Sequence, residues 1–314
     1  MQIGFYDHSL YQLYLNRSVL GIIPSDTLNY IYIEYPIALT VLLALLVVLG
    51  FALTTISMCL FIYYRKEPAV KATSSTVSLC LFIGCYCLLT SSFFQVITSG
   101  TSIYGSKQSL RTFVCMFDIS ITNVGMDMVF ATVIAKTLRI YFIFNTFGKV
   151  SKVCSDQGLF ILISSILSVK IIVLIIWASF DAHRLIDVQQ LVSNTVPPFI
   201  RVVQSCRSMH HGLWIFLAFG YSTLLALIMV LLAIMTRKIE RDDYKDSKKI
   251  SLLVGALILD VYICAPLWLI LQGTAAPIWS WLAYNFGTLI AALLCQVLLI
   301  LPKTFPLVVK SFQK

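Results

Sequence analysis

The sequence predicts an all-α membrane protein, a bundle of seven transmembrane helices with its N-terminus outside the cell and its C-terminus in the cytoplasm. Hydrophobic residues make up 59% of the 314 residues, charged residues only 12%, and the mean hydropathy is +0.89. A soluble domain of this composition lacks the polar side chains needed to cover its surface. Seven long apolar runs and an uneven distribution of positive charge supply the rest of the prediction.

Each apolar run is bounded by polar or charged residues and is long enough to cross a bilayer. A helix rises about 1.5 Å per residue and the hydrocarbon core is about 30 Å thick, so about 20 residues suffice. The predicted spans are Pro36–Tyr64, Ser75–Thr98, Thr112–Phe144, Gln157–Phe180, Leu213–Met235, Ser251–Leu271 and Ile278–Leu301. An odd number of spans argues against the two-half architecture of many transporters.

The lysine and arginine residues set the predicted orientation. If the N-terminus is outside, sixteen of them lie on the cytoplasmic side and six on the outer side, with Lys170 inside a span. The positive-inside rule therefore predicts an outer N-terminus and a cytoplasmic C-terminus. The net charge of +9 is then explained by the basic residues on the cytoplasmic side, and no nucleic-acid partner is expected.

Three segments follow from this topology. Residues 1–35 form an extracellular segment, residues 36–302 the seven-helix domain and residues 303–314 a short cytoplasmic tail. Neither end is long enough to bury a hydrophobic core of its own, so no second folded domain is expected. Asn16, in Asn16-Arg17-Ser18, is a candidate glycosylation acceptor on the outer side.

Two of the nine cysteines stand apart from the rest. Six lie within apolar runs and Cys154 falls in an inner loop, whereas Cys115 and Cys206 face the oxidising outer side. A disulfide between these two would tie the second outer loop to the third span. The alternative is a pair of free thiols.

Three charged residues lie well inside spans, where an ionised side chain is costly and usually marks a function or an internal pair. They are Asp127, Lys170 and Asp260. In one interpretation they form a buried cluster in which Lys170 neutralises one aspartate and a polar ligand or water meets the other. In the other, Lys170 extends to the interface and each aspartate bonds a neighbouring hydroxyl or is protonated.

A second group of charges lies where the third and sixth spans meet the cytoplasm, in Ala135-Lys136-Thr137-Leu138-Arg139 and Lys245-Asp246-Ser247-Lys248-Lys249. A lysine and an aspartate at the inner ends of two helices form an ion pair that holds these ends together. Alternatively, both charges are solvated, and such a pair contributes at most about 1 kcal/mol. Charge alone does not decide between the two.

Several segments, in order along the chain, resemble class C G-protein-coupled receptors, particularly the type B γ-aminobutyric acid receptors. They are Ile23-Pro24-Ser25-Asp26, Phe113-Val114-Cys115 through Ala135-Lys136-Thr137-Leu138-Arg139-Ile140-Tyr141, Trp177-Ala178-Ser179-Phe180-Asp181-Ala182-His183-Arg184, Cys206-Arg207-Ser208-Met209-His210-His211-Gly212-Leu213-Trp214, Thr236-Arg237-Lys238-Ile239 and Asp246-Ser247-Lys248. The resemblance implies a Cys115–Cys206 disulfide. It also implies an ion pair between Lys136 and Asp246, termed the ionic lock below.

The resemblance further implies a multi-pass receptor of the plasma membrane that activates a heterotrimeric G protein, of the Gi/o type. Candidate residues facing the G protein are Lys71, Arg139, Lys149, Lys152, Arg237 and Lys248. The chain contains neither the large two-lobed ligand-binding domain nor the coiled-coil tail of that family. We therefore expect either constitutive activity or a homo- or heterodimer with a class C receptor, held together in membrane lipid.

The alternative function is a transporter or channel in which Asp127, Lys170 and Asp260 relay protons or ions. A retinal pigment is disfavoured because the seventh span has no lysine in its interior. No enzyme activity, metal site or cofactor is expected, since the four histidines lie outside the spans and no nucleophile motif accompanies them.

Overall fold

The computed structural model describes residues 29–32, 36–67, 70, 74–100, 108–145, 155–182, 184–192, 199–237, 246–272 and 277–300. The chain forms two compact units. One comprises Met1–Glu34 with Ile186–Ser205, and the other comprises Tyr35–Leu185 with Cys206–Lys314. The second unit contains all of the long helices.

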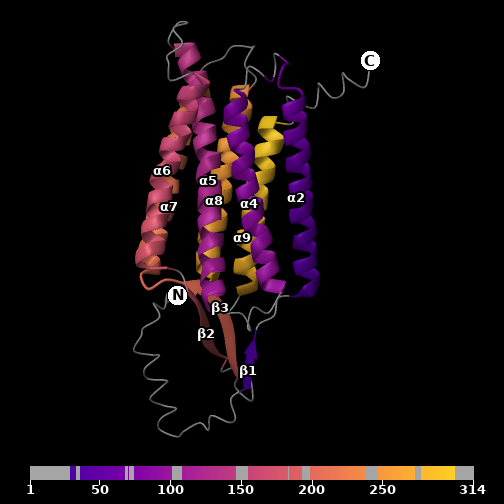
Figure 1. Ribbon diagram of the computed structural model, residues 1–314, viewed down its shortest axis with the longest axis vertical. Coiled ribbons are helices and arrows are strands. Elements are labelled where there is room, and N and C mark those ends of the chain that lie inside the picture. The colour runs from indigo at the N-terminus through magenta and orange to yellow at the C-terminus, as the bar shows by residue number, and fades with distance from the viewer. Residues whose placement is uncertain are drawn as a thin grey trace. The chain divides into compact units, whose positions relative to one another are not determined.

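Seven long helices form a bundle (Figure 1). They are α2 (Ile37–Tyr63), α4 (Ser75–Gly100), α5 (Gln108–Asn145), α6 (Asp156–Phe180), α7 (His211–Arg237), α8 (Asp246–Gln272) and α9 (Pro277–Cys295). Within the described ranges, six helices are long and apolar enough to cross a membrane, and α8 contains a shorter apolar stretch, Ile250–Cys264. The predicted helical fold is confirmed, and each helix coincides with all or most of one of the predicted spans.

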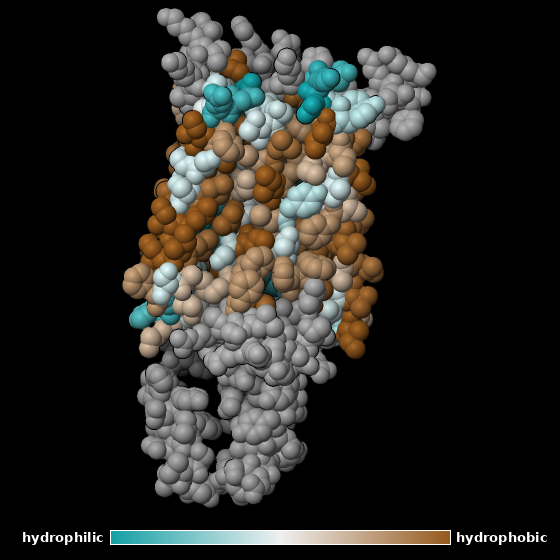
Figure 2. All heavy atoms as spheres, in the orientation of Figure 1, coloured by the Kyte–Doolittle hydropathy of each residue, from teal (hydrophilic) through white to brown (hydrophobic). Residues whose placement is uncertain are grey.

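The bundle presents apolar side chains outward, as a membrane requires. Figure 2 shows hydrophobic residues over most of the face in view and hydrophilic ones mainly toward the ends of the helices. Large apolar side chains such as Leu45 on α2, Ile161 on α6 and Phe216 on α7 are more than 60% exposed. In water this surface would be unfavourable, whereas lipid tails solvate it, and the helices satisfy their own backbone hydrogen bonds.

Helix α5 lies at the centre of the packing. It contacts α4, α6, α7 and α8, and its residues Val129, Phe130 and Val133 are almost fully buried. The largest hydrophobic cluster joins them to residues of α2, α4, α7, α8 and α9. A polar side chain on a buried face of α5 therefore has neighbours on several helices.

Helix α9 continues into a π-helical turn, η4 (Gln296–Ile300). Gln296 is buried, and its amide donates a hydrogen bond to the hydroxyl of Thr54 on α2. π-helical turns are rare and cost regular hydrogen-bond geometry. Here the turn accompanies a polar contact between the last helix and the first.

Most of a three-stranded sheet belongs to the first unit, and this sheet was not predicted from the sequence. Strand β1 (Asn29–Tyr32) comes from the N-terminal segment, while β2 (Arg184–Val192) and β3 (Phe199–Arg207) lie in the loop between α6 and α7. The strand order is β1-β3-β2, and β1 runs parallel to β3. The pairing of β1 with the distant loop was missed because it is set by contacts remote in sequence.

Glycines allow α4 and α5 to approach closely. A Cβ atom added at Gly125 on α5 would lie 2.8 Å from Cβ of Cys87, 3.1 Å from the carbonyl oxygen of Gly84 and 3.1 Å from the amide nitrogen of Leu88. Two of these neighbours are backbone atoms of α4, which cannot rotate away. The absence of a side chain at Gly125 therefore sets the distance between the two helices.

We predict that Gly125→Ala lowers the stability of the bundle by about 1–3 kcal/mol, because the added methyl group overpacks the contact between α4 and α5. The measurement is the melting temperature (Tm) of the purified protein in lipid nanodiscs. Gly220→Ala is the matched control, since a Cβ at Gly220 on α7 meets nothing within 4 Å. Equal Tm values for the two variants would contradict the prediction.

Candidate functional site

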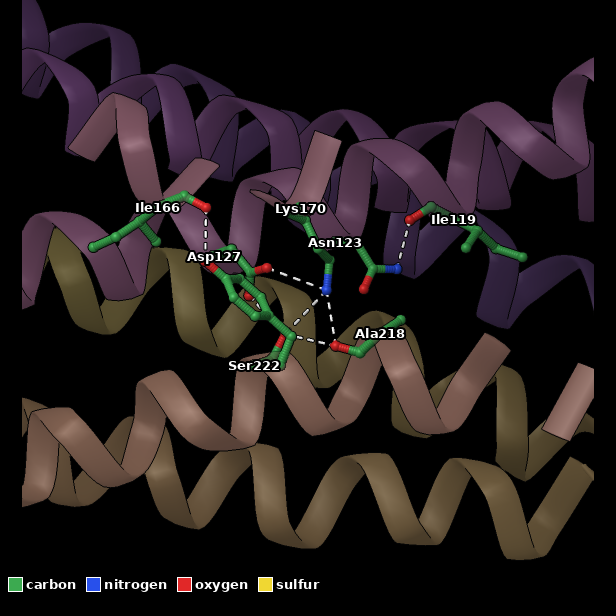
Figure 3. A network of polar contacts seen from close by, with 8 residues as sticks. Ile119, Asn123, Asp127, Ile166, Lys170, Ala218 and Ser222 are labelled. Carbon is green, nitrogen blue, oxygen red and sulfur yellow. Dashed lines mark hydrogen bonds and ion pairs between the residues drawn. The ribbon is translucent and has the colours of Figure 1, made fainter. Parts of the chain in front are cut away.

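Two of the three charged residues inside the predicted spans lie together. Asp127 is on α5 and Lys170 on α6, and both side chains are 0% exposed. The ammonium nitrogen Nζ of Lys170 lies 3.1 Å from Oδ2 of Asp127 (Figure 3). The lysine therefore points into the bundle and does not extend to the membrane interface.

Helix α7 completes the environment of this ion pair. Nζ of Lys170 donates to the carbonyl oxygen of Ala218 at 2.8 Å and to Oγ of Ser222 at 3.3 Å. Ser222 in turn donates to Oδ1 of Asp127 at 2.6 Å. An ammonium group has three donors, so Asp127, Ala218 and Ser222 account for all of them.

Tyr221 adds a further contact between α6 and α7. Its hydroxyl donates to the carbonyl oxygen of Ile166 at 2.7 Å, and Nζ of Lys170 lies 5.7 Å from the centroid of its ring. That distance is within the range of a cation–π interaction. The group thus forms a closed polar joint between α5, α6 and α7, with its charges paired and its donors used.

The third charged residue, Asp260, has a separate environment on α8. It is 9% exposed and accepts a hydrogen bond from Sγ of Cys264 at 3.3 Å. Across the described part of the chain, no hydrogen bond or ion pair joins Asp260 to Asp127 or Lys170. A relay needs a continuous path between its members, so this arrangement gives no support to a transporter or channel.

The residues of the predicted ionic lock lie on α5 and α8. Lys136 is half-buried on α5, and Asp246 is the first residue of α8, two helices that contact each other. The side chain of Asp246 lies outside the described residues. The lock therefore stays a prediction.

Among the residues predicted to face the G protein, only Arg139 has a described side chain. It forms an exposed ion pair with Asp156 at 3.3 Å, between α5 and the start of α6. The side chains of the others, and all of Asn16, lie outside the described residues; the set comprises Lys71, Lys149, Lys152, Arg237 and Lys248.

The structure describes the side chain of only one of the two cysteines in the predicted disulfide. Cys115 is 3% exposed and is disulfide-bonded. The backbone of Cys206 lies in β3, but its side chain is outside the described residues. The pairing of these two cysteines stays a prediction.

A further aspartate within the third predicted span, Asp118, was missed. It lies on α5 and accepts hydrogen bonds from Ser91 and Gln95 on α4. An aspartate within the apolar run Thr112–Phe144 was the available signal. Asp118 lies three residues from Cys115, near the end of the predicted span, and was not predicted as a site residue.

Asp181, the first residue after α6, holds the start of α7. Its carboxylate accepts hydrogen bonds from the backbone amides of Met209 at 2.8 Å and His210 at 2.7 Å, and from the indole nitrogen of Trp214 at 3.0 Å. Desolvation acts to raise the pKa of Asp181, but these hydrogen bonds outweigh it and the pKa lies below its ordinary value. The ring of Trp214 also stacks on Trp177 of α6, with centroids 5.7 Å apart.

Comparisons with known proteins indicate the family to which the chain is related. A family model described as "7 transmembrane sweet-taste receptor of 3 GCPR" matches residues 33–303. The chain is similar to γ-aminobutyric acid type B receptor subunit 2 of Caenorhabditis elegans, with 22% identity over 267 residues, which are 84% of this chain and 31% of that protein.

Two further relatives are similar over much of the chain. Metabotropic glutamate receptor 4 of Macaca fascicularis is 27% identical over 227 residues, which are 70% of this chain and 23% of that protein. γ-Aminobutyric acid type B receptor subunit 1 of Mus musculus is 21% identical over 328 residues, covering 99% of this chain and 33% of that protein. The chain spans about a third or less of the length of the curated relatives it matches.

We predict that Lys170→Met destabilises the bundle by about 3–5 kcal/mol, because it leaves the Asp127 carboxylate buried without a counter-charge. The double variant Lys170→Met with Asp127→Leu should recover most of this loss, since no unpaired charge remains. The measurement is a double-mutant cycle on Tm in nanodiscs. Additive losses in the double variant would show that the ion pair is not energetically coupled.

We predict that Asp181→Ala lowers Tm at neutral pH and that the difference from the wild type disappears in acid. The folded-state pKa of Asp181 is lower than its unfolded value of about 3.9. The contribution of Asp181 to the stability of the folded state is therefore complete above the unfolded pKa and is lost as pH falls through the folded pKa. Tm measured against pH checks this, and a difference that persists well below pH 3 would contradict it.

Proposed function

Because the chain belongs to the class C family of G-protein-coupled receptors, we propose that it couples an extracellular or intramembrane signal to nucleotide exchange on a heterotrimeric G protein. The observation that carries the proposal is the family match over residues 33–303, which includes all seven helices. The chain is a multi-pass membrane protein, and the family places it in the plasma membrane.

The proposed mechanism is a shift between two arrangements of the helices, without bond chemistry in the receptor. A ligand shifts such an equilibrium only by its difference in affinity for the two states. The Asp127–Lys170 joint supports one part of this mechanism, since it fixes α5 to α6 and α7. The inner ends of α5 and α8 are then the elements that separate, and Lys136 and Asp246 form the lock between them.

The partners follow from the family. We propose a G protein of the Gi/o type, bound by a basic inner face to which Lys71, Arg139, Lys149, Lys152, Arg237 and Lys248 contribute. The two relatives named as receptor subunits 1 and 2 support a homo- or heterodimer with a class C receptor. On the outer side we propose the Cys115–Cys206 disulfide, which the bonded state of Cys115 supports.

Two assays on the same protein separate this function from the transporter alternative. Expression in cells should raise G-protein turnover, with or without a class C partner subunit, while reconstitution into liposomes should give no proton or ion flux. Flux without any G-protein turnover in either combination would overturn the proposal.

We predict that Asp246→Ala and Lys136→Ala each raise basal G-protein turnover, because the resting state loses the lock. The charge-swapped pair Lys136→Asp with Asp246→Lys should return toward the wild-type level. An ion pair at the water boundary contributes about 0.2–1 kcal/mol, so the increase should be a few-fold at most and should shrink in high salt.

The matched control is Asp242→Ala, which removes an acidic residue from the same inner loop without touching the proposed lock. It should leave basal turnover at the wild-type level when surface expression is equal. If both lock variants behave like this control, the two charges are solvated and the lock does not exist.

A further inference from the structure

A second polar network lies between α4, α5 and α9, apart from the Asp127–Lys170 joint. Its members are the polar side chains of Ser91, Gln95, Asp118, Thr122, Tyr284 and Asn285. Ser91 is 0% exposed and Asn285 only 1%. Six polar residues inside a membrane bundle are costly unless each group has a partner.

The Asp118 carboxylate accepts hydrogen bonds from two side chains of α4. Oγ of Ser91 donates to Oδ1 at 2.6 Å, and Nε2 of Gln95 donates to Oδ2 at 2.7 Å. The orientation of the Gln95 amide is fixed, because its Oε1 accepts from Nδ2 of Asn285 at 3.2 Å. Both carboxylate oxygens therefore face donors, which is the pattern of an ionised carboxylate.

Three hydroxyl groups of the network lie close together. Thr122 donates to the backbone carbonyl oxygen of Asp118 at 2.8 Å. Oγ of Ser91 also lies 2.5 Å from Oγ1 of Thr122, and the Tyr284 hydroxyl lies 3.0 Å from Oγ of Ser91 and close to Oγ1 of Thr122. In each of these three pairs either hydroxyl can be the donor. Among the described residues, the side chains that donate to the Asp118 carboxylate are those of Ser91 and Gln95.

No positively charged side chain balances the Asp118 carboxylate within the described part of the chain. Asp118 forms no ion pair among the described residues, in contrast to Asp127, which has Lys170. In addition, Oδ1 of Asn285 is buried and has no hydrogen-bond partner. A half-buried carboxylate without a counter-charge and a buried, unpartnered amide oxygen in the same network are both suited to contact a cation.

We propose that this network binds a sodium ion between α4, α5 and α9, with Asp118 as its charged ligand. Carboxylate, amide and hydroxyl oxygens are the ligands that hard cations prefer. The single carboxylate balances one positive charge, which favours a monovalent ion over Ca²⁺ or Mg²⁺, sites for which usually contain several carboxylates or phosphates. Cys115, one helical turn away, is disulfide-bonded, which places this end of α5 toward the oxidising and sodium-rich side of the membrane.

This proposal goes beyond G-protein coupling and is tested without a G protein. The purified full chain in nanodiscs is titrated with sodium chloride against potassium or N-methylglucamine chloride at constant total salt. Unfolding is followed with a thiol-reactive fluorophore, which reports exposure of the buried free cysteines such as Cys85 and Cys295. Sodium should raise Tm saturably by about 2–5 °C, because a ligand that binds only the folded state stabilises it.

Asp118→Asn tests the charged ligand directly. It keeps the size of the side chain and should abolish the sodium-specific rise in Tm. Asp260→Asn is the matched control, because it removes another carboxylate from within a span, on α8, and should keep the wild-type response. Equilibrium binding of radioactive sodium to the wild type gives a second readout that does not depend on whether Asp118→Asn folds, with one saturable site expected.

Two outcomes overturn the proposal. The first is equal stabilisation of the wild type by sodium, potassium and N-methylglucamine together with no saturable sodium binding, which would mean that a water molecule or a proton satisfies the network. The second is a sodium response in Asp118→Asn equal to that of Asp260→Asn, which would place any sodium site elsewhere.

Discussion

Inside a bilayer, every polar group has to find its partner within the protein, because the surrounding lipid offers none. This constraint explains why Lys170 points into the bundle, where Asp127, Ala218 and Ser222 take its three donors. It also explains why the long apolar side chains lie outside, on the surface that lipid tails cover. The bundle is therefore organised around its few polar joints as much as around its apolar core.

Most of these joints meet on α5. Asp118 accepts hydrogen bonds from side chains of α4, and the absence of a side chain at Gly125 lets α4 approach. Asp127 forms an ion pair with the lysine of α6 and accepts a hydrogen bond from a serine of α7. Lys136 then lies nearer the other end of the same helix. A single helix thus carries contacts at several depths, so a displacement of α5 at one depth alters what its partners meet at another. Such a helix is suited to transmit a change between the two sides of a membrane.

The helices were predictable because length and hydropathy act locally: any run of about 20 apolar residues meets the requirement for spanning. The presence of charges at Asp127 and Lys170 was equally visible. Their pairing was not, because spacing along the chain does not reveal which face of α5 meets which face of α6. Asp260 illustrates this, since its depth resembles that of Asp127 but its hydrogen-bond partner is Cys264 on its own helix.

Other features were hidden for different physical reasons. The close approach at Gly125 depends on the backbone of α4, so nothing in the sequence around Gly125 distinguishes it from Gly220 on α7. The polar network around Asp118 is assembled from α4, α5 and α9, and hydroxyl residues such as Ser91 and Thr122 are unremarkable until they face a carboxylate. The sheet was missed because one strand is remote from the other two.

That remoteness has a consequence for biosynthesis. Asn29 of β1 pairs with Phe199 of β3, about 170 residues later in the chain. At about 5–20 residues per second, a ribosome needs roughly 10–35 s to make the intervening segment. During this time four helices enter the membrane while β1 waits without its partner strand. The sheet is therefore a late product of synthesis, and an unpaired strand of this kind is open to capture by another chain until β3 arrives.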